Sequence, residues 1–207
     1  MPRKQSLLNA CNIPSQILYE DCDAVERISA NLLSHIPVNI PESVIIACIG
    51  TDRSTGDSLG PLVGTLLSEK LHSAFSVYGT LDDPIHAVNL EEKMNEIHAK
   101  HKDSFIIAVD ACLGRVKSVG TVQILPGPLK PGAGVNKNLP EVGDMHITGI
   151  VNVSGFMEFF VLQNTRLSLV LKMARTIADS IDLAGQSLMV SRNTANMDWE
   201  FNQEKAT

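Results

Sequence analysis

The stretch SVIIACIGTDRSTGDSLGP, residues 43–61, holds the pattern that decides the fold. Its start, residues 43–49, is almost wholly apolar, as is typical of a strand covered on both faces in a parallel sheet. A polar loop follows, and Pro61 then stands where the first turn of a helix tolerates a missing N–H. One face of that helix carries Leu62, Val63, Leu66, Leu67 and Leu71. The stretch therefore predicts a strand, a loop and a helix in succession.

The same alternation continues along the chain. Residues 105–109 form a second buried apolar run, and a helix is expected before it at residues 89–97. Further strands are expected at residues 76–81 and 119–125, and a late apolar stripe predicts a helix over residues 167–181. Strands that alternate with helices predict an α/β fold in three layers, with a mostly parallel sheet and helices on both faces.

Length and composition fit one globular domain. The chain has 207 residues, of which 44% are hydrophobic and 19% are charged. This is enough apolar material for a single core and too much for a disordered chain. We interpret residues 1–207 as a single α/β domain, and we expect residues 1–20 and 185–207 to be irregular extensions.

Charge and hydropathy exclude several classes of partner. The formal net charge is −6, which gives no electrostatic attraction to a nucleic acid backbone or to an anionic membrane. No apolar run approaches the roughly 18 residues of a membrane span, and the first residues do not resemble a secretion signal. We expect a cytoplasmic protein with neither nucleic acid nor membrane partners. The four cysteines lack the paired spacing of a zinc site.

Two aspartates follow predicted strands. Asp57 lies between the strand at 43–49 and the next helix, and Asp110 ends the run at 105–109. In an open α/β sheet the functional crevice lies beyond the carboxyl ends of the strands, so both carboxylates are expected at one rim. Two close carboxylates do not both ionise cheaply, so one can act as an acid while the other acts as a base. Alternatively, the pair can hold a divalent metal.

Structural roles are the competing interpretation of these residues. Asp57 is also a suitable helix cap, and Asp110 a suitable turn residue. His146 follows a long loop, where an imidazole can bind metal or move a proton, but a lone histidine is more often solvated or satisfied in the core. Cys112 can be read as a nucleophile paired with His146 or, more commonly, as a packing residue.

The glycines around the first loop do not indicate a nucleotide site. The segment from Gly50 to Gly56 has the length of a phosphate-binding turn, but Asp57 and Ser58 stand where a Walker loop has Lys and Ser or Thr. A flavodoxin-like phosphate loop is a third alternative. The chain has only one Trp, two Tyr and six Phe, which leaves few rings to flank a flavin.

Four motifs, in this order, resemble the YyaC sporulation family over about residues 40–185: IACIGTDRSTGDSLGP, FIIAVDACLG, PGAGVN and MHITGIVNV. The germination protease of spores is similar in a glycine-ended strand, a loop with an aspartate before Leu-Gly-Pro, and an aspartate in Val-Asp-Ala. The resemblance implies that its catalytic aspartates fall on Asp57 and Asp110. It also implies that the chain acts during sporulation or germination, in the cytoplasm or the forespore.

Hydrogenase-maturation endopeptidases, the HybD-like group, are similar at three positions that bind metal in that family. The matching positions are Asp57, Asp110 and His146. The resemblance implies a HybD-like fold of the phosphorylase/hydrolase-like type. Two carboxylates and one imidazole suit a divalent ion such as zinc or nickel.

These observations together predict a hydrolase. We interpret the chain as an endopeptidase that acts on a protein or peptide substrate and activates water between its two aspartates. The alternative is a catalytically silent binding or assembly protein that keeps the protease fold. The sequence leaves open whether the chain forms a homo-oligomer. The expected substrate-binding residues are Gly50, Thr51, Gly56, Thr148 and Gly149.

Overall fold

The described part of the chain folds around one six-stranded sheet. The computed structural model describes residues 16–37, 43–70, 74–131 and 139–204. The strands are β1 (Gln16–Leu18), β2 (Val44–Cys48), β3 (Ser76–Tyr78), β4 (Phe105–Gly114), β5 (Thr121–Pro126) and β6 (Met145–Val153). The helices are α1 (Ala24–His35), α2 (Leu59–Ser68), α3 (Leu90–Lys100), α4 (Glu158–Gln163) and α5 (Leu167–Glu204), with a short 3₁₀ helix, η1, at Val116–Ser118.

The sheet is mixed, with a parallel centre. Its strand order is β1-β5-β6-β4-β2-β3. Strand β2 pairs in parallel with β3 and β4, and β4 pairs in parallel with β6. Strand β5 runs antiparallel to β6, and β1 runs antiparallel to β5. The parallel strands β2, β3, β4 and β6 therefore end at the same edge of the sheet.

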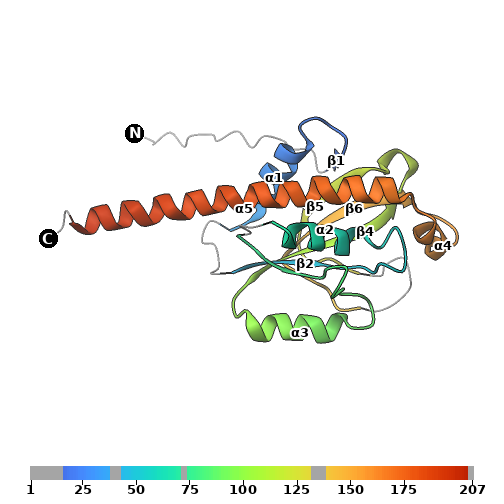
Figure 1. The fold of residues 1–207 in the computed structure, drawn as a ribbon, viewed down its shortest axis with the longest axis horizontal. Helices are drawn as coiled ribbons and strands as arrows, with labels where there is room; N and C mark the ends of the chain where they lie inside the picture. Colours follow the sequence, from blue (N-terminus) through green and yellow to red (C-terminus); the bar gives the residue numbers. More distant parts are fainter. Residues whose placement is uncertain (1–15, 38–42, 71–73, 132–138, 205–207) are drawn as a thin grey trace, which may run out of the picture.

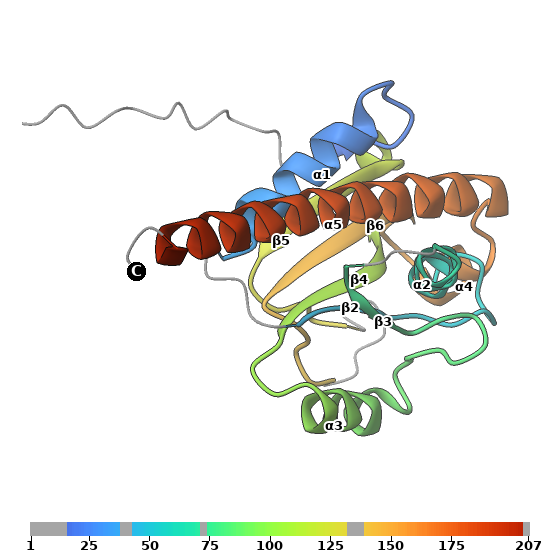
Figure 2. The same ribbon diagram turned by 60° about the vertical axis from the view of Figure 1, so that its left-hand side comes forward.

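Helices cover both faces of this sheet, as the sequence predicts (Figures 1 and 2). Helices α1, α2 and α5 pack on one face and α3 lies on the other. Alternate residues of β2 serve the two layers: Ile46 and Cys48 belong to the cluster under α5, and Ile45 and Ala47 to the cluster over α3. Every residue of β2 is buried, which explains why its sequence is a continuous apolar run. The three-layer α/β fold is confirmed.

Both ends of the described chain are more regular than the sequence suggests. The irregular extension expected at 185–207 is wrong, because α5 continues to Glu204 and extends past the edge of the sheet (Figure 1). The chain has no proline after Pro140 to break the helix, and the apolar stripe fades where the helix no longer has a layer to cover. Near the other end, β1 pairs with β5 instead of being irregular. Residues 1–15 and 205–207 lie outside the described residues.

The helices give no indication of a membrane span. Among the residues described, none of the helices is both long and apolar enough to cross a bilayer.

Candidate functional site

The loop that carries Asp57 is folded back tightly on the end of β2. The Thr51 N–H donates to the Asp57 carbonyl over 3.1 Å, and the Gly50 N–H donates to the Ile85 carbonyl over 2.8 Å. Gly50 has a positive φ of 147°, and a Cβ there would lie 2.0 Å from the Asp57 carbonyl oxygen. Only glycine permits this approach. The loop therefore holds Asp57 close to the carboxyl end of β2.

Asp110 reaches the same place from the neighbouring strand. The pairing of β2 with β4 ends at Cys48 and Val109, so Asp110 is the first residue of β4 beyond it. On its other side Asp110 pairs with Thr148 of β6. Its side chain lies on the α3 face of the sheet, because it alternates with Val109, which packs in the α5 layer.

One cavity of about 640 Å³ brings the two aspartates together. This volume is within the range of about 300 to 1,000 Å³ that is usual for ligand sites. Its walls come from the ends of β2 and β4, the loop after β3, the hairpin after β5, and α4. The lining residues that matter below are Asp57, Asp110, Thr148, His86, Phe159 and Leu162.

The two carboxyl groups differ in their electrostatic environment. The pKa of Asp110 is raised to about 8: burial raises it most, the Ala111 N–H that donates to it over 2.7 Å lowers it in part, and the charge of Asp57 raises it. Burial also raises the pKa of Asp57 above its usual value. The buried Ser54 hydroxyl beside Asp57 opposes that shift, although its geometry falls short of a well-formed hydrogen bond. The pair is therefore suited to hold one proton at neutral pH.

Helix capping does not account for Asp57 in this structure. The N-cap of α2 is Ser58, and its hydroxyl donates to the Thr55 carbonyl instead of capping the helix. Over the described segments, no hydrogen bond joins the Asp57 carboxylate to a backbone N–H of α2. Asp57 instead lines the cavity.

His146 lies on the same sheet face as Asp110 but not in the cavity lining. It pairs with Ala108, two residues before the pair formed by Asp110 and Thr148. Two residues along a strand correspond to about 7 Å. The Nδ1 atom of His146 lies 2.9 Å from the Gly127 carbonyl oxygen, which ties the ring to the hairpin after β5.

The predicted three-ligand metal site is not assembled. Asp57 and Asp110 share the cavity, whereas His146 is displaced from it along β6. In the parts of the chain that the structure describes, no group of three or more His, Cys, Asp or Glu side chains is arranged to hold a metal ion. The residues therefore fit an aspartate pair and do not fit a site made of two aspartates and a histidine.

The expected substrate-binding residues divide into two groups. Gly50, Thr51 and Thr148 line the cavity. Gly149 instead packs in the core, where a Cβ would lie 2.3 Å from Leu59 and 2.5 Å from Met173. Gly56 lies against Leu162 of α4, and its backbone N–H donates to the Leu162 carbonyl over 2.8 Å.

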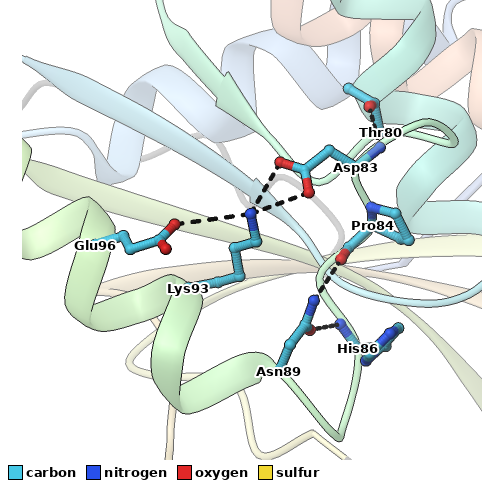
Figure 3. Close-up of polar contacts among 7 residues, drawn as sticks. All are labelled: Thr80, Asp83, Pro84, His86, Asn89, Lys93 and Glu96. Carbon is cyan, nitrogen blue, oxygen red and sulfur yellow. Dashed lines mark hydrogen bonds and ion pairs between the residues drawn. The ribbon is translucent and has the colours of Figure 1, made fainter.

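His86 lines the cavity, and the sequence analysis missed it. It lies in the loop after β3, whose Ile85 forms a parallel bridge with Ile49 at the end of β2. Asn89 accepts a hydrogen bond from the His86 N–H and donates to the Pro84 carbonyl (Figure 3). The signal that could have found it is its position beyond the carboxyl end of a parallel strand. The same rule located the two aspartates.

Further polar contacts hold this loop (Figure 3). The Asp83 N–H donates to the Thr80 hydroxyl over 3.1 Å, and Lys93 of α3 pairs with the Asp83 carboxylate at 3.0 Å. The Lys93 ammonium also lies 3.7 Å from Glu96. Because these ion pairs are exposed, they orient the loop more than they stabilise the fold.

Cys112 also lines the cavity but is a poor nucleophile there. The pKa of its thiol is raised to about 11: burial raises it most, Thr148 lowers it in part, and the nearby charge of Asp110 raises it. A thiol with such a pKa is almost wholly protonated at neutral pH. The reading of Cys112 as a packing residue is thus favoured.

Comparison with known proteins shows the family. The model of the family described as "Protein of unknown function (DUF1256)" matches residues 16–180, which include both aspartates. The chain belongs to the DUF1256 family. It is 55% identical over 188 residues to the uncharacterized protein YyaC of Bacillus subtilis strain 168, which covers 90% of this chain and 92% of that protein.

A solved structure shares the fold of this DUF1256 protein. The [NiFe] hydrogenase maturation protease HycI from Thermococcus kodakarensis KOD1 superposes with a TM-score of 0.53 at 18% identity. The match covers 75% of this chain and 98% of HycI. At this level of identity the likeness shows a protease-like fold and nothing about the activity of the DUF1256 chain.

Proposed function

We propose that the chain is an endopeptidase. It hydrolyses a peptide bond of a substrate that is bound between the carboxyl groups of Asp57 and Asp110. The observation that supports it most is that these two residues line one cavity, Asp57 from the loop after β2 and Asp110 from β4, with the pKa of Asp110 raised to about 8. A pair of acids whose pKa values are separated by their surroundings is the arrangement that general acid and base catalysis needs.

In the proposed mechanism Asp57 is the base and Asp110 the acid. Asp57 takes a proton from water, and the oxygen of that water attacks the carbonyl carbon of the substrate. Asp110 gives its proton to the carbonyl oxygen, which produces a neutral tetrahedral intermediate. When this intermediate collapses, the C–N bond breaks and the proton held by Asp57 passes to the leaving amine. One hydroxyl of the intermediate returns its proton to Asp110, which leaves the carboxylic acid product and restores the starting protonation state of the pair.

The proposed substrate is a protein, encountered during sporulation or germination in the cytoplasm or the forespore. The motifs shared with the spore germination protease support this context. The printed name of the structural relative, a hydrogenase maturation protease, supports a protein substrate as well.

A cleavage survey tests the proposal. Proteins extracted from sporulating Bacillus subtilis are incubated with the purified chain, and new amino termini are identified by mass spectrometry. We expect a small set of new termini that are absent with the matched Asp57→Asn/Asp110→Asn double variant. Identical termini with both proteins would refute the peptidase.

A binding or assembly role is the second candidate. Exposed aromatic side chains beside the cavity favour it, since such groups contact partners as readily as substrates. In that case the double variant and the wild type would capture the same intact protein from the extract, with equal affinity and without cleavage.

A further inference from the structure

Four large apolar side chains stand exposed where the chain leaves β6 and enters α4. Phe156 is 89% exposed, and Met157, Phe159 and Phe160 are each between 51% and 53% exposed. We refer to these four residues as the apolar lip. The chain has only six phenylalanines, and three of them lie in this lip. Such a concentration of exposed apolar surface marks an interaction site.

Helix α4, which carries Phe159 and Phe160 of the lip, is in contact with the loop that carries Asp57. The Gly56 N–H donates to the Leu162 carbonyl over 2.8 Å, and a Cβ on Gly56 would lie 2.7 Å from the Leu162 side chain. From the other side, Asn152 donates to the Val161 carbonyl over 3.3 Å and to the Thr165 hydroxyl over 3.2 Å. None of the residues in α4 is fully buried, so these hydrogen bonds, together with the packing of Leu162 against the core, fix the position of this helix.

The backbone at the start of α4 is also unusual. Met157 is the N-cap of the helix and has a φ of 59° and a ψ of 47°, in the left-handed region. A non-glycine residue in this region is strained, and such residues are often found at binding sites. The turn brings Phe159 and Phe160 together in an edge contact, with ring centroids 5.8 Å apart.

The lip is continuous with the aspartate cavity. Phe159 and Leu162 line that cavity together with Asp57 and Asp110. The remaining walls include Leu113, Leu129 and Leu139, so the cavity that joins the two aspartates to Phe159 has several apolar side chains in its lining. A chain bound across the two aspartates would continue over these rings.

We propose that the apolar lip binds an apolar segment of an extended polypeptide. In the same polypeptide, a peptide bond next to this segment lies at Asp57 and Asp110. The part about the neighbouring bond rests on the proposed peptidase function, whereas the binding of the segment does not. The lip selects bulky aliphatic or aromatic residues, because the free energy gained when its aromatic side chains are covered grows with the apolar surface that is buried.

Two other occupants agree less well with the structure. A side chain of this size has a surface of roughly 200 Å², so the four partly exposed side chains together present about 500 Å² to solvent. A stable dimer buries roughly 800 Å² on each partner, which is more than the lip offers. The formal net charge of −6 opposes an anionic bilayer.

A binding experiment with an inert enzyme tests the lip apart from catalysis. The Asp57→Asn/Asp110→Asn variant is titrated against an array of synthetic dodecapeptides in which runs of Phe, Leu and Met are compared with Ser, Asp and Lys. We expect the apolar peptides to bind at least tenfold more tightly. Adding Phe159→Ser and Phe160→Ser should abolish this preference, while adding Val116→Ser, which alters an exposed valine on η1, should leave it unchanged.

Several outcomes would overturn the inference. One is an unchanged preference in the Phe159→Ser/Phe160→Ser background, with melting by circular dichroism showing that the variant is folded. Others are a dimer in light scattering that these substitutions dissociate, or binding to phosphatidylcholine/phosphatidylglycerol vesicles that they abolish. If apolar peptides bind through the lip but the wild type cleaves none of them, the lip stands and the peptidase proposal fails.

Discussion

Asp110 of β4 lies directly opposite Thr148 of β6, two residues beyond the pair that Ala108 forms with His146. This register puts a hydroxyl, and not an imidazole, beside the most strongly perturbed carboxyl group of the cavity. The charged neighbour that raises the pKa of Asp110 is Asp57, which lies on the loop after β2. The proposed chemistry therefore depends on two aspartates, and each can be tested alone.

We expect Asp57→Asn and Asp110→Asn each to lower kcat/KM by at least about 100-fold, the lower range for removal of a general acid or base. Asparagine keeps the size of the side chain but cannot exchange a proton in the same way. The measurement is the initial rate on a peptide taken from the cleavage survey. Cys112→Ala serves as a control that alters the cavity wall at a residue read as a packing residue, and it should lose much less activity.

The stability of the protein should depend on pH through Asp110. Its folded pKa of about 8 lies above the ordinary value of 3.8, so the folded state binds the proton more tightly than the unfolded state. This contribution to stability is fully present below about pH 4 and is lost as pH rises through about 8. At pH 9 we expect Asp110→Asn to be more stable than the wild type by at least about 1 kcal/mol.

Thermal melting from pH 4 to pH 9 checks this expectation. The difference in Tm between Asp110→Asn and the wild type should grow with pH and then level off above about 8. A difference that is constant over this range would mean that Asp110 keeps an ordinary pKa.

Activity should fall as pH rises through about 8, because Asp110 must carry its proton to act as the acid. It should also fall at low pH, where Asp57 becomes protonated and no longer acts as the base. The measurement is the pH profile of kcat/KM, whose two limbs belong to the pair as a whole. A rate that still rises above pH 9 would contradict this assignment of roles.

Gly56→Ala should displace the apolar lip. The new Cβ would lie 2.7 Å from the Leu162 side chain and 3.0 Å from its carbonyl oxygen, so α4 must move or strain. We expect a loss of stability of about 1 to 3 kcal/mol, the usual range for overpacking, and weaker binding of apolar peptides. Urea unfolding and the dodecapeptide titration measure the two effects. Full stability together with unchanged peptide binding would show that α4 is not fixed by this contact.

The fold could be predicted from the sequence because its signals are local and strong. The apolar run of β2 and the run of β4 are buried on both faces, and this leaves little ambiguity. The end of α5 could not be predicted in the same way. Its hydrophobic period weakens past the sheet although helix formation continues, so periodicity alone gave the wrong boundary.

The candidate site could be predicted only in part. The strand-end rule placed Asp57 and Asp110 at one edge, and the structure puts both in one cavity. The positions of His86 and His146 depend on the register of strands and on a bridge between distant segments, at Ile49 and Ile85. No local pattern encodes such a register, which explains why one histidine was overlooked and the other was placed among the ligands.

The last prediction concerns His146. In the structure its ring holds the hairpin through the Gly127 carbonyl, so His146→Ala should cost about 1 kcal/mol of stability, the usual value for one hydrogen bond. A metal ligand would behave differently. Its removal would abolish the binding of zinc or nickel.

Calorimetric titration with zinc and with nickel at pH 7.5 separates these roles, because a structural histidine changes the Tm and a ligand changes the heat of binding. We expect His146→Ala to melt at a lower temperature than the wild type but to titrate like it. His98→Ala, which removes an exposed imidazole from α3, controls for adventitious binding to surface histidines. If His146→Ala loses a binding event that both the wild type and His98→Ala retain, His146 must move to join Asp57 and Asp110, and the three-ligand metal site replaces the metal-free aspartate pair.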